Sequence, residues 1–505
     1  MRTSLSHALL AAAALAACAP PAPPEMPSWP EPDAVAPDAA ESAAGPESPE
    51  QRAARLQAEA ILVDGHSDIP SVVLGGSLDL ADPGREPTPT ELARMKAAGI
   101  TGEFFSIHVG TSSWQKPTPL GGGAARRALD LVDATHRQIE RRGGAFLLVR
   151  RAVDVRRAKR EGRIAAIMGI EGGHAIENSL SALRAFYRLG VRYMTLTHTT
   201  TNDWADSAGG ALEPGILRHR GLAPFGEEVV REMQRIGMIV DVSHASDSTM
   251  RAVMKVAKAP VIASSSIRAA AQQRRDLDDS LLHALAENGG VAMVNVWALF
   301  LDEAYAEQSE RFLQKHGARL RELGEKYQGD PRGLREEIDA LRAQEGPIKP
   351  PPLSRIADHI DRVVKVAGVD HVGIGSSFGG VDVREEGLAA IEGLPNITLE
   401  LVRRGYSDED IRKLLGGNFL RVFEQVEAHA ASTETVLSGD GSTRQLTAAE
   451  LPAPPEPPPA PQRPWQPPPP EQRPILPAPL PPAPRPPPTP AQGGAPPAVD
   501  LRLER

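Results

Sequence analysis

The sequence predicts an α/β protein whose central part, residues 53–427, folds as a (β/α)8 TIM barrel. Short, nearly continuous apolar runs recur along this part, and such runs are typical of parallel strands buried on both faces. Most are separated by segments with helical spacing, among them residues 180–189, 225–236 and 279–287. Strands that alternate with helices indicate a parallel sheet, and eight repeats favour closure into a barrel. The eight predicted strands are residues 61–63, 103–107, 164–170, 193–196, 238–242, 260–263, 291–296 and 371–374.

A long, highly charged insertion, residues 303–345, separates the seventh and eighth predicted strands. Its spacing predicts one or two amphipathic helices, interrupted near Gly329-Asp330-Pro331. In a barrel such a connection lies at the carboxyl ends of the strands, so it could cover an active site. A solvated helical excursion is an equally good interpretation.

The first residues have the pattern of a bacterial lipoprotein signal peptide, predicted over residues 1–17. An apolar run, too short to span a bilayer, ends in Leu15-Ala16-Ala17-Cys18, which resembles a lipobox. Cys18 is then the lipidation site, and the chain is anchored in the envelope of a bacterium, facing outside the cytoplasm in the periplasm or at the outer membrane. The alternative is a plain secretory signal with an incidental cysteine.

Composition predicts two tails without a packed core. Residues 18–52, which include the lipidated cysteine, are rich in Pro, Ala, Glu and Ser, and residues 428–505 hold much of the chain's proline. Such segments bury too little apolar surface to fold, so we expect a disordered linker and a disordered, polyproline-like tail. The net charge of −9, with both signs mixed, gives no basic patch for nucleic acid. One cysteine excludes an intrachain disulfide and a cysteine-based zinc site.

Potential metal ligands follow four of the predicted strands. His66 and Asp68 follow the first, Glu171 the third, His198 the fourth and His244 the fifth. Positions i and i+2 of a strand point to the same side, so His66 and Asp68 can bind one ion together. Taken singly, each residue could be a hydrogen-bonded histidine or a helix-capping acid. Together they predict a site for zinc or a similar divalent ion at the carboxyl ends of the strands, with Glu171 able to bridge two ions.

Several longer stretches around these residues resemble one known family. The stretches are VDGHSD (63–68), GIEGGH (169–174), LTH (196–198) with NDWADS (202–207), DVSH (241–244) and LGGNFLRVF (415–423). They are similar to the membrane (renal) dipeptidase family, peptidase family M19, whose members are binuclear zinc hydrolases of the amidohydrolase-like, metal-dependent barrel class. The resemblance covers roughly residues 53–426 and implies a metallodipeptidase that acts on small peptides.

The resemblance implies a role for each matching residue. His66 and Asp68 would bind the first zinc, Glu171 would bridge, and His244 would bind the second. His198 would contact the substrate and stabilise the oxyanion, and with Glu171 it is a candidate for the catalytic proton transfer. Arg275 lies where the family has an arginine that holds the substrate carboxylate, a task that suits its bidentate fork. A surface arginine is the alternative at that position.

Two strand ends depart from the family pattern. Ser265, in Ser264-Ser265-Ser266, stands where the family has a histidine ligand of the second zinc. After the eighth strand, Ser377 and Gly379 replace two aspartates, the first of which binds zinc and assists proton transfer. The resemblance therefore implies one zinc ion in this chain against two in the family.

Other histidines are expected to be structural or solvated. His174 belongs to the family's Glu-Gly-Gly-His turn, while His108, His219, His359 and His371 are expected in loops or at the starts of elements.

Three interpretations of the whole chain stay open. The first is a hydrolase of dipeptides or related small amides. The second is a catalytically inactive lipoprotein that binds peptide or cell-wall fragments. The third places the function in the proline-rich tail. Relatives in the family dimerise, which leaves a homodimer open, and the lipid anchor would be the only membrane contact.

Overall fold

The computed structural model describes residues 47–74, 91–110, 123–142, 144–209, 216–265, 277–327, 331–344, 350–376, 388, 391–433, 435–437 and 443–445. The chain divides into two units, Met1–Ser48 and Pro49–Arg505, and every element below belongs to the second. The predicted signal peptide, Cys18, Arg275, Ser377 and Gly379 lie outside the described residues.

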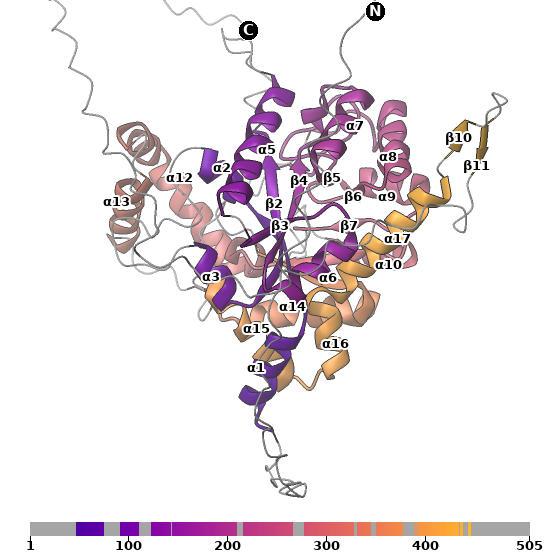
Figure 1. Cartoon of the computed structure of the whole chain (residues 1–505). Coiled ribbons are helices and arrows are strands. Elements are labelled where there is room, and N and C mark those ends of the chain that lie inside the picture. The colour runs from indigo at the N-terminus through magenta and orange to yellow at the C-terminus, as the bar shows by residue number, and fades with distance from the viewer. Residues whose placement is uncertain are drawn as a thin grey trace, which may run out of the picture. The chain divides into compact units, whose positions relative to one another are not determined.

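A closed ring of eight parallel strands forms the centre of this unit (Figure 1). The strands pair in the order β2-β1-β9-β8-β7-β6-β5-β4, and β2 returns to β4 to close the ring. This confirms the predicted barrel, and each of the eight apolar runs contributes one strand. Their bounds are β1 Leu62–Ser67, β2 Ile100–His108, β4 Ile164–Glu171, β5 Val191–Thr195, β6 Ile239–Asp241, β7 Ile262–Ala263, β8 Val291–Asn295 and β9 Val372–Gly375.

A further short strand, β3 (Phe146–Leu148), was not predicted. It pairs with the first residues of β4, from Ile164 to Ala166, whereas β5 pairs with β4 only from Met168 onward. The strand therefore adds to the sheet before β5 begins and is not part of the closed ring. A run of three residues is too short to show strand periodicity, which explains the omission.

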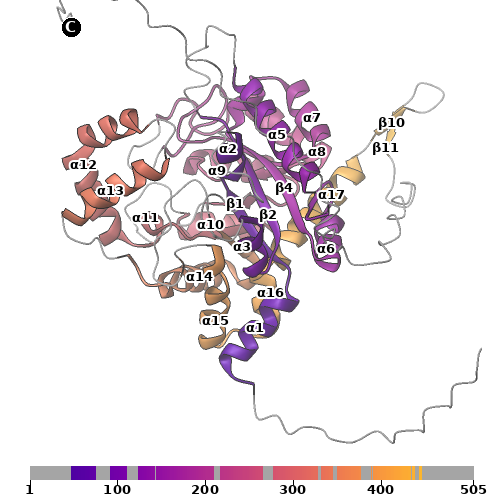
Figure 2. The same ribbon diagram turned by 60° about the vertical axis from the view of Figure 1, so that its left-hand side comes forward.

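Helices surround the ring in both ribbon views (Figures 1 and 2). The prediction over residues 180–189 and 279–287 matches α7 and α10, whose first turns are capped by the side chains of Ser179 and Asp278. The helix predicted over residues 225–236 begins one residue earlier in the structure, at Pro224, because proline fits the first turn of a helix. The helices are α1 Pro49–Glu59, α2 Ile69–Leu74, α3 Glu91–Ala97, α5 Ala124–Arg141, α6 Ala152–Glu161, α7 Leu180–Leu189, α8 Pro224–Ile236, α9 Asp247–Val256, α10 Asp279–Glu287, α11 Ala298–Leu301, α12 Glu303–Lys326, α13 Pro331–Gln344, α14 Ser354–Ala367, α15 Pro395–Arg403, α16 Asp408–Arg412 and α17 Asn418–Thr433, with short turns η1 Gly173–Ile176, η2 Val369–His371, η3 Ile391–Gly393 and η4 Lys413–Gly417.

Buried aromatic side chains fill the interior of the barrel. The rings of Phe104 and Tyr193 lie 4.5 Å apart by centroid, and Phe419 of α17 packs edge-on to Phe104 at 4.9 Å. The stretch 415–423 lies against the first residues of the barrel strands, since Asn418 donates to the carbonyls of Val369 and Val372. The stretch therefore packs at the amino end of the barrel.

The insertion forms two helices, as predicted: α12 and α13, on either side of residues 328–330. Both ribbon views place the pair at the flank of the barrel (Figures 1 and 2). Tyr305 and Phe312 of α12 are buried, whereas most of its polar residues are exposed. No helix among the described residues is both long and apolar enough to span a membrane.

The ends of the unit differ slightly from the predicted bounds. The helix α1 begins at Pro49, inside the segment predicted as linker, because Leu56 is fully buried and Arg52 pairs with Asp408 at 2.7 Å. At the other end, α17 continues to Thr433, and a hairpin of β10 (Thr435–Leu437) and β11 (Thr443–Gln445) lies within the segment predicted as tail.

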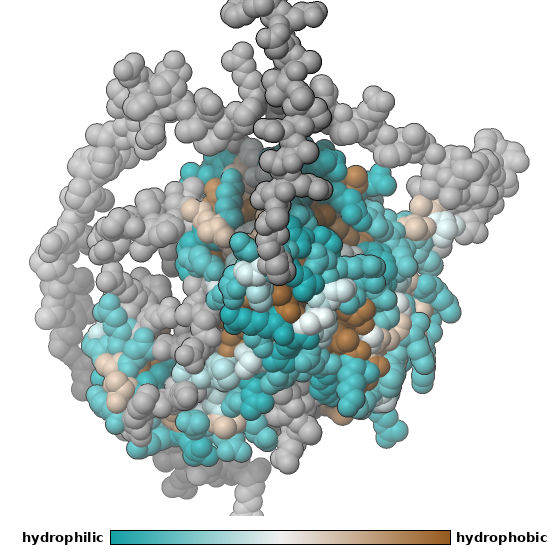
Figure 3. Space-filling view, turned by 90° about the horizontal axis from the view of Figure 1, so that it is seen from below, coloured by the Kyte–Doolittle hydropathy of each residue, from teal (hydrophilic) through white to brown (hydrophobic). Residues whose placement is uncertain are grey.

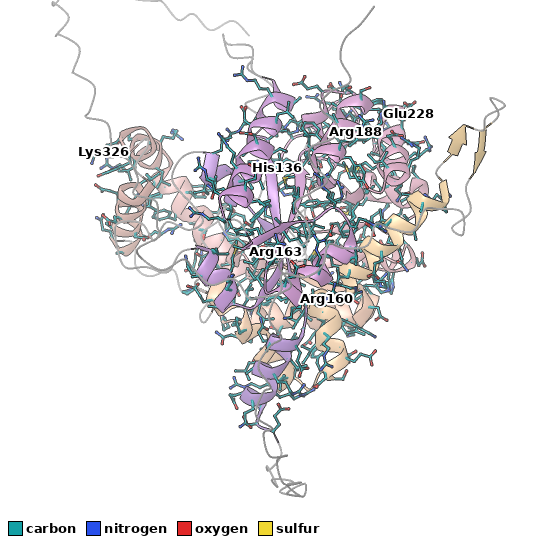
Figure 4. All side chains as sticks on the ribbon, in the orientation of Figure 1. His136, Arg160, Arg163, Arg188, Glu228 and Lys326 are labelled. Atoms are coloured by element: carbon teal, nitrogen blue, oxygen red, sulfur yellow. The ribbon has the colours of Figure 1, made fainter. Side chains whose placement is uncertain are left out.

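The face of the molecule seen from below is largely hydrophilic, with small apolar areas between (Figure 3). Charged side chains such as Arg188 of α7 and Glu228 of α8 lie on the peripheral helices (Figure 4). A carboxylate or imidazole inside the barrel mouth is therefore an exception that needs a chemical reason.

Candidate metal centre

The carboxyl ends of four strands bring the predicted ligands into one buried cluster. His66 lies in β1 with Asp68 just after it, Glu171 is the last residue of β4, and His198 and His244 follow β5 and β6. Asp68 and His198 are the more open members, with side-chain exposures of 16% and 18%, so a substrate would reach the cluster from their side.

Glu171 is at the centre of this cluster, and its two carboxylate oxygens face different partners. Oε2 accepts a hydrogen bond from Ser106 Oγ at 3.0 Å and lies 3.7 Å from His66 Nε2. Oε1 lies 3.2 Å from His244 Nε2 and 3.6 Å from His198 Nε2. One carboxylate with partners on both sides is the arrangement that a bridging ligand requires.

His66, Asp68 and Glu171 form the first group with metal-binding geometry. Each offers one ligand atom, and these atoms all lie within 4.8 Å of one another. His66 Nε2 is 3.4 Å from Asp68 Oδ2. One imidazole and two carboxylates suit a divalent ion of the zinc type, and three protein ligands leave a coordination position for water or substrate.

The electrostatics of the cluster fit a cation. Burial lowers the pKa of His66, but the carboxylates of Glu171 and Asp68 outweigh burial and raise that pKa to about 10. Burial also raises the pKa of Glu171, and here the imidazoles of His66 and His198 outweigh it and hold the pKa well below its ordinary value. The pocket therefore favours a positive charge beside Glu171, and a divalent ion meets that requirement in place of a proton.

Backbone anchoring fixes the first strand end. Asp64, buried in β1, accepts a hydrogen bond from the Ser376 N–H at 2.7 Å and contacts the Ser376 hydroxyl. The same hydroxyl donates to the carbonyl of His66 at 3.1 Å. Burial raises the pKa of Asp64 to about 6, although the hydrogen bonds from Ser376 oppose the shift. The end of β9 thus holds the backbone that presents His66.

On the opposite side of the barrel, hydroxyl groups occupy the ends of β6 and β7. Asp241 accepts hydrogen bonds from the hydroxyls of Thr195 at 2.7 Å and Ser264 at 2.6 Å. Ser265 donates its N–H to Ser243 Oγ at 2.9 Å, and its own hydroxyl accepts from Asn295 Nδ2 at 2.6 Å. Ser265 therefore contacts two neutral side chains, those of Ser243 and Asn295.

His244 is held close to Glu171 by an unusual backbone conformation. Its φ of 63° lies in the left-handed region, which non-glycine residues rarely adopt and which is common at functional sites. The Ser207 hydroxyl contacts the carbonyl of His198 and lies 3.3 Å from that of His244. Among the described residues, however, no group of three potential ligands within 4.8 Å includes His244.

His108 was expected in a loop or at the start of an element, and this placement is wrong. It is the last residue of β2, where its Cα pairs with that of Glu171. Its ring lies 4.6 Å from that of His198 by centroid, and His108, Glu171 and His198 form a second group whose ligand atoms lie within 4.8 Å. The predicted strand ended at Ile107. Had it been extended by one residue, the rule that identified the other ligands would have identified His108.

The remaining histidines have structural contacts. His174 Nε2 lies 2.9 Å from Val109 O, His219 Nε2 lies 2.9 Å from Asn202 O, and His371 Nδ1 lies 2.7 Å from Gly290 O. His359 is inside α14 and not at its start, with Nε2 3.2 Å from Leu301 O.

An eight-stranded parallel barrel with a buried imidazole and carboxylate cluster at the carboxyl ends of its strands defines a metal-dependent hydrolase class. The model of the membrane dipeptidase family, peptidase family M19, matches residues 50–436. Dipeptidase verJ of Clonostachys rogersoniana is 34% identical over an alignment of 387 residues that covers 74% of this chain and 87% of verJ. This chain therefore belongs to the membrane dipeptidase family.

Solved structures share the fold. The probable dipeptidase PvdM from Pseudomonas aeruginosa aligns with a TM-score of 0.62 and 27% identity, over 76% of this chain and 100% of PvdM. A metallo peptidase from Rhodobacter sphaeroides, liganded with a phosphinate mimic of the dipeptide L-Ala-D-Ala, aligns with a TM-score of 0.55 over 73% of this chain and 100% of that chain. At 22% identity the latter likeness concerns the fold alone.

Proposed function

We propose that this chain hydrolyses dipeptides or related small amides with a divalent ion, zinc by its donor set, bound by His66, Asp68 and Glu171. The observation that carries the proposal is the convergence of these three ligand atoms within 4.8 Å at the carboxyl end of the barrel. The dipeptidase names of the family and of verJ support the substrate class.

The ion, when bound, would polarise a substrate carbonyl and lower the pKa of a water molecule. His66, Asp68 and Glu171 would hold it, and the Ser106 hydroxyl would keep Glu171 Oε2 in place. His198, more open than the first ligands, would donate its ring N–H to the oxygen on which negative charge develops, an interaction worth about 3–4 kcal/mol in comparable sites. Glu171 and His198 are the candidate groups to take and return the proton.

The substrate carboxylate would be held by Arg275, which lies outside the described residues. Arginine suits this role because its planar fork makes two parallel hydrogen bonds to a carboxylate. An Arg275→Lys variant should raise KM for dipeptides with little change in kcat. Substrates without a free carboxylate should be unaffected by the change.

The test combines metal analysis with a broad dipeptide panel. The protein should hold a tightly bound divalent ion and release free amino acids, and Glu171→Ala should abolish both properties. Glu228→Ala, a surface change on α8, is the matched control and should leave both intact (Figure 4). If no ion is found and no dipeptide is cleaved while peptide binding persists, the inactive binding protein is the better interpretation.

The two positions that lack the ligand types of the family, Ser265 and Ser377, give a second test. Ser265→His with Ser377→Asp would restore the two ligand types that the family carries at these positions. If neither metal content nor the rate of hydrolysis rises in the double variant, these two positions have been misplaced.

We further propose that Cys18 is acylated and anchors the chain to a membrane of the bacterial envelope. The support is the lipobox-like sequence that precedes this cysteine. Cys18→Ser should move the protein from the membrane fraction to the soluble fraction and abolish labelling with a fatty-acid analogue. Membrane retention of the serine variant would contradict the proposal.

A homodimer, as in relatives, would double the mass measured by light scattering.

A further inference from the structure

We propose that His108 is a metal ligand in this chain, and that with His198 and Glu171 Oε1 it forms a second ion site. This inference rests on the proposed function, because the second ion shares Glu171 with the first. It replaces the expectation of one zinc ion in this chain, and in a chain that holds both ions His198 would be a ligand and would not donate a ring N–H to the substrate.

The geometry of the three side chains is the first support. One ring nitrogen each of His108 and His198 and one oxygen of Glu171 lie within 4.8 Å of one another. The distance of 3.6 Å from His198 Nε2 to Glu171 Oε1 leaves room for an ion at ordinary bond lengths of about 2 Å to each atom. Two imidazoles and one carboxylate are a common ligand set for catalytic zinc.

The state of the His108 ring is the second and independent support. Its Nε2 is buried and has no hydrogen-bond partner in the described part of the chain. A buried polar atom without a partner costs about 1–3 kcal/mol, so such atoms are rare unless a ligand or a water molecule satisfies them. His174, by comparison, contacts a backbone carbonyl through its ring and fits a structural role.

The two carboxylate oxygens of Glu171 face different partners, which leaves space for an ion on each side. Its Oε2 faces His66 and Ser106, whereas its Oε1 faces His198 and His244. Two ions can therefore bind to different oxygens of the same carboxylate.

The proposed second site would take its ligands from strand ends that carry histidines. On the side of β7, Ser265 is engaged by Asn295, and a neutral hydroxyl is a poor zinc ligand. On the side of β2, His108 supplies an imidazole directly opposite Glu171 in the strand register. His244 lies 3.2 Å from Glu171 Oε1, but it is not part of the group of ligand atoms that His108, His198 and Glu171 form within 4.8 Å. The second ion would thus move from the β6 and β7 side of Glu171 toward β2 and β5.

The experiment counts ions. The mature full-length protein, stripped with a chelator, is titrated with Zn²⁺, and bound metal is measured by atomic emission and by calorimetry. Wild type should bind two ions per chain. His108→Ala and the more conservative His108→Gln should bind one, with the affinity for the second ion at least about 100-fold weaker. Loss of a mere hydrogen-bond partner of a ligand costs roughly 10–100-fold, so a positioning role would leave two measurable sites.

His136→Ala is the matched control, because this histidine lies on the outer helix α5 and should not affect either ion (Figure 4). Thermal melts of the stripped proteins show whether each variant is folded. One ion in wild type, or two in both His108 variants, would overturn the inference while leaving the proposed function intact. No ion at all in folded wild type would overturn the proposed function as well.

Discussion

Gly169 of β4 should be irreplaceable, because a side chain there would occupy the space of an aromatic ring. A Cβ atom at this position would lie 1.9 Å from both Cε1 and Cζ of Tyr193. Tyr193 is 1% exposed and its ring lies 4.5 Å from that of Phe104, so it has no room to turn away. Small-to-large changes in a packed core cost about 1–3 kcal/mol, and an overlap of this depth places Gly169→Ala at or above the upper end, near 3 kcal/mol.

Urea denaturation followed by circular dichroism measures this loss. Gly324→Ala is the control, because its Cβ would meet no atom within 4 Å and alanine favours the helix α12 by about 0.5–1 kcal/mol. Since Gly169 lies two residues before Glu171, a displaced β4 should also weaken metal binding in the alanine variant.

A double variant tests the cause. Tyr193→Ala alone should cost about 3–5 kcal/mol as a large core truncation. Combined with Gly169→Ala, it removes the overlap, so the double variant should be more stable than the sum of the single losses predicts. An unchanged urea midpoint for Gly169→Ala, or strict additivity in the double variant, would refute the reasoning.

Two further predictions concern the supports of the site. Ser106→Ala removes the hydrogen bond to Glu171 Oε2, so ion affinity should fall roughly 10–100-fold in a chelator competition; unchanged affinity would contradict this role. Asp206 accepts three backbone N–H groups of the following loop, and although burial raises its pKa, these bonds outweigh burial and lower it. A lowered carboxyl pKa stabilises the fold above the unfolded-state pKa of about 3.9, and that stabilisation is lost as the pH falls through the folded-state pKa. Asp206→Asn should therefore cost about 1–3 kcal/mol in urea denaturation at pH 7 and progressively less below pH ~4, and a deficit that does not shrink in acid would count against this explanation.

The barrel was predictable because its strands are buried on both faces. A parallel strand between a filled barrel and a layer of helices must be apolar on both sides, and the eight apolar runs follow from that requirement. Helix ends were predictable where a local signal marks them, as at Ser179 and Asp278. The short strand β3 has no such signal, because its pairing depends on where β5 begins.

The convergence of the candidate metal ligands was predictable for a related reason. In a parallel barrel, polar residues that directly follow apolar runs converge at one end, and this rule identified His66, Glu171, His198 and His244. His108 was missed because the predicted strand ended one residue early, and its pairing with Glu171 across β2 and β4 joins residues far apart in the sequence. The contact of Asn295 with Ser265 also joins residues far apart in the sequence.

The hydroxyl of Ser207 contacts the backbone carbonyls of both His198 and His244. Because one side chain joins the two backbone segments, a shift of one histidine should be accompanied by a shift of the other. A ligand that pulls on one imidazole would shift a carbonyl, and through the hydroxyl it would shift the other. The two imidazoles should therefore move together. The loop from Asn202 to Ser207 would set the distance between them. Selection for a new ion or a new substrate could adjust that spacing through one loop without replacing either histidine.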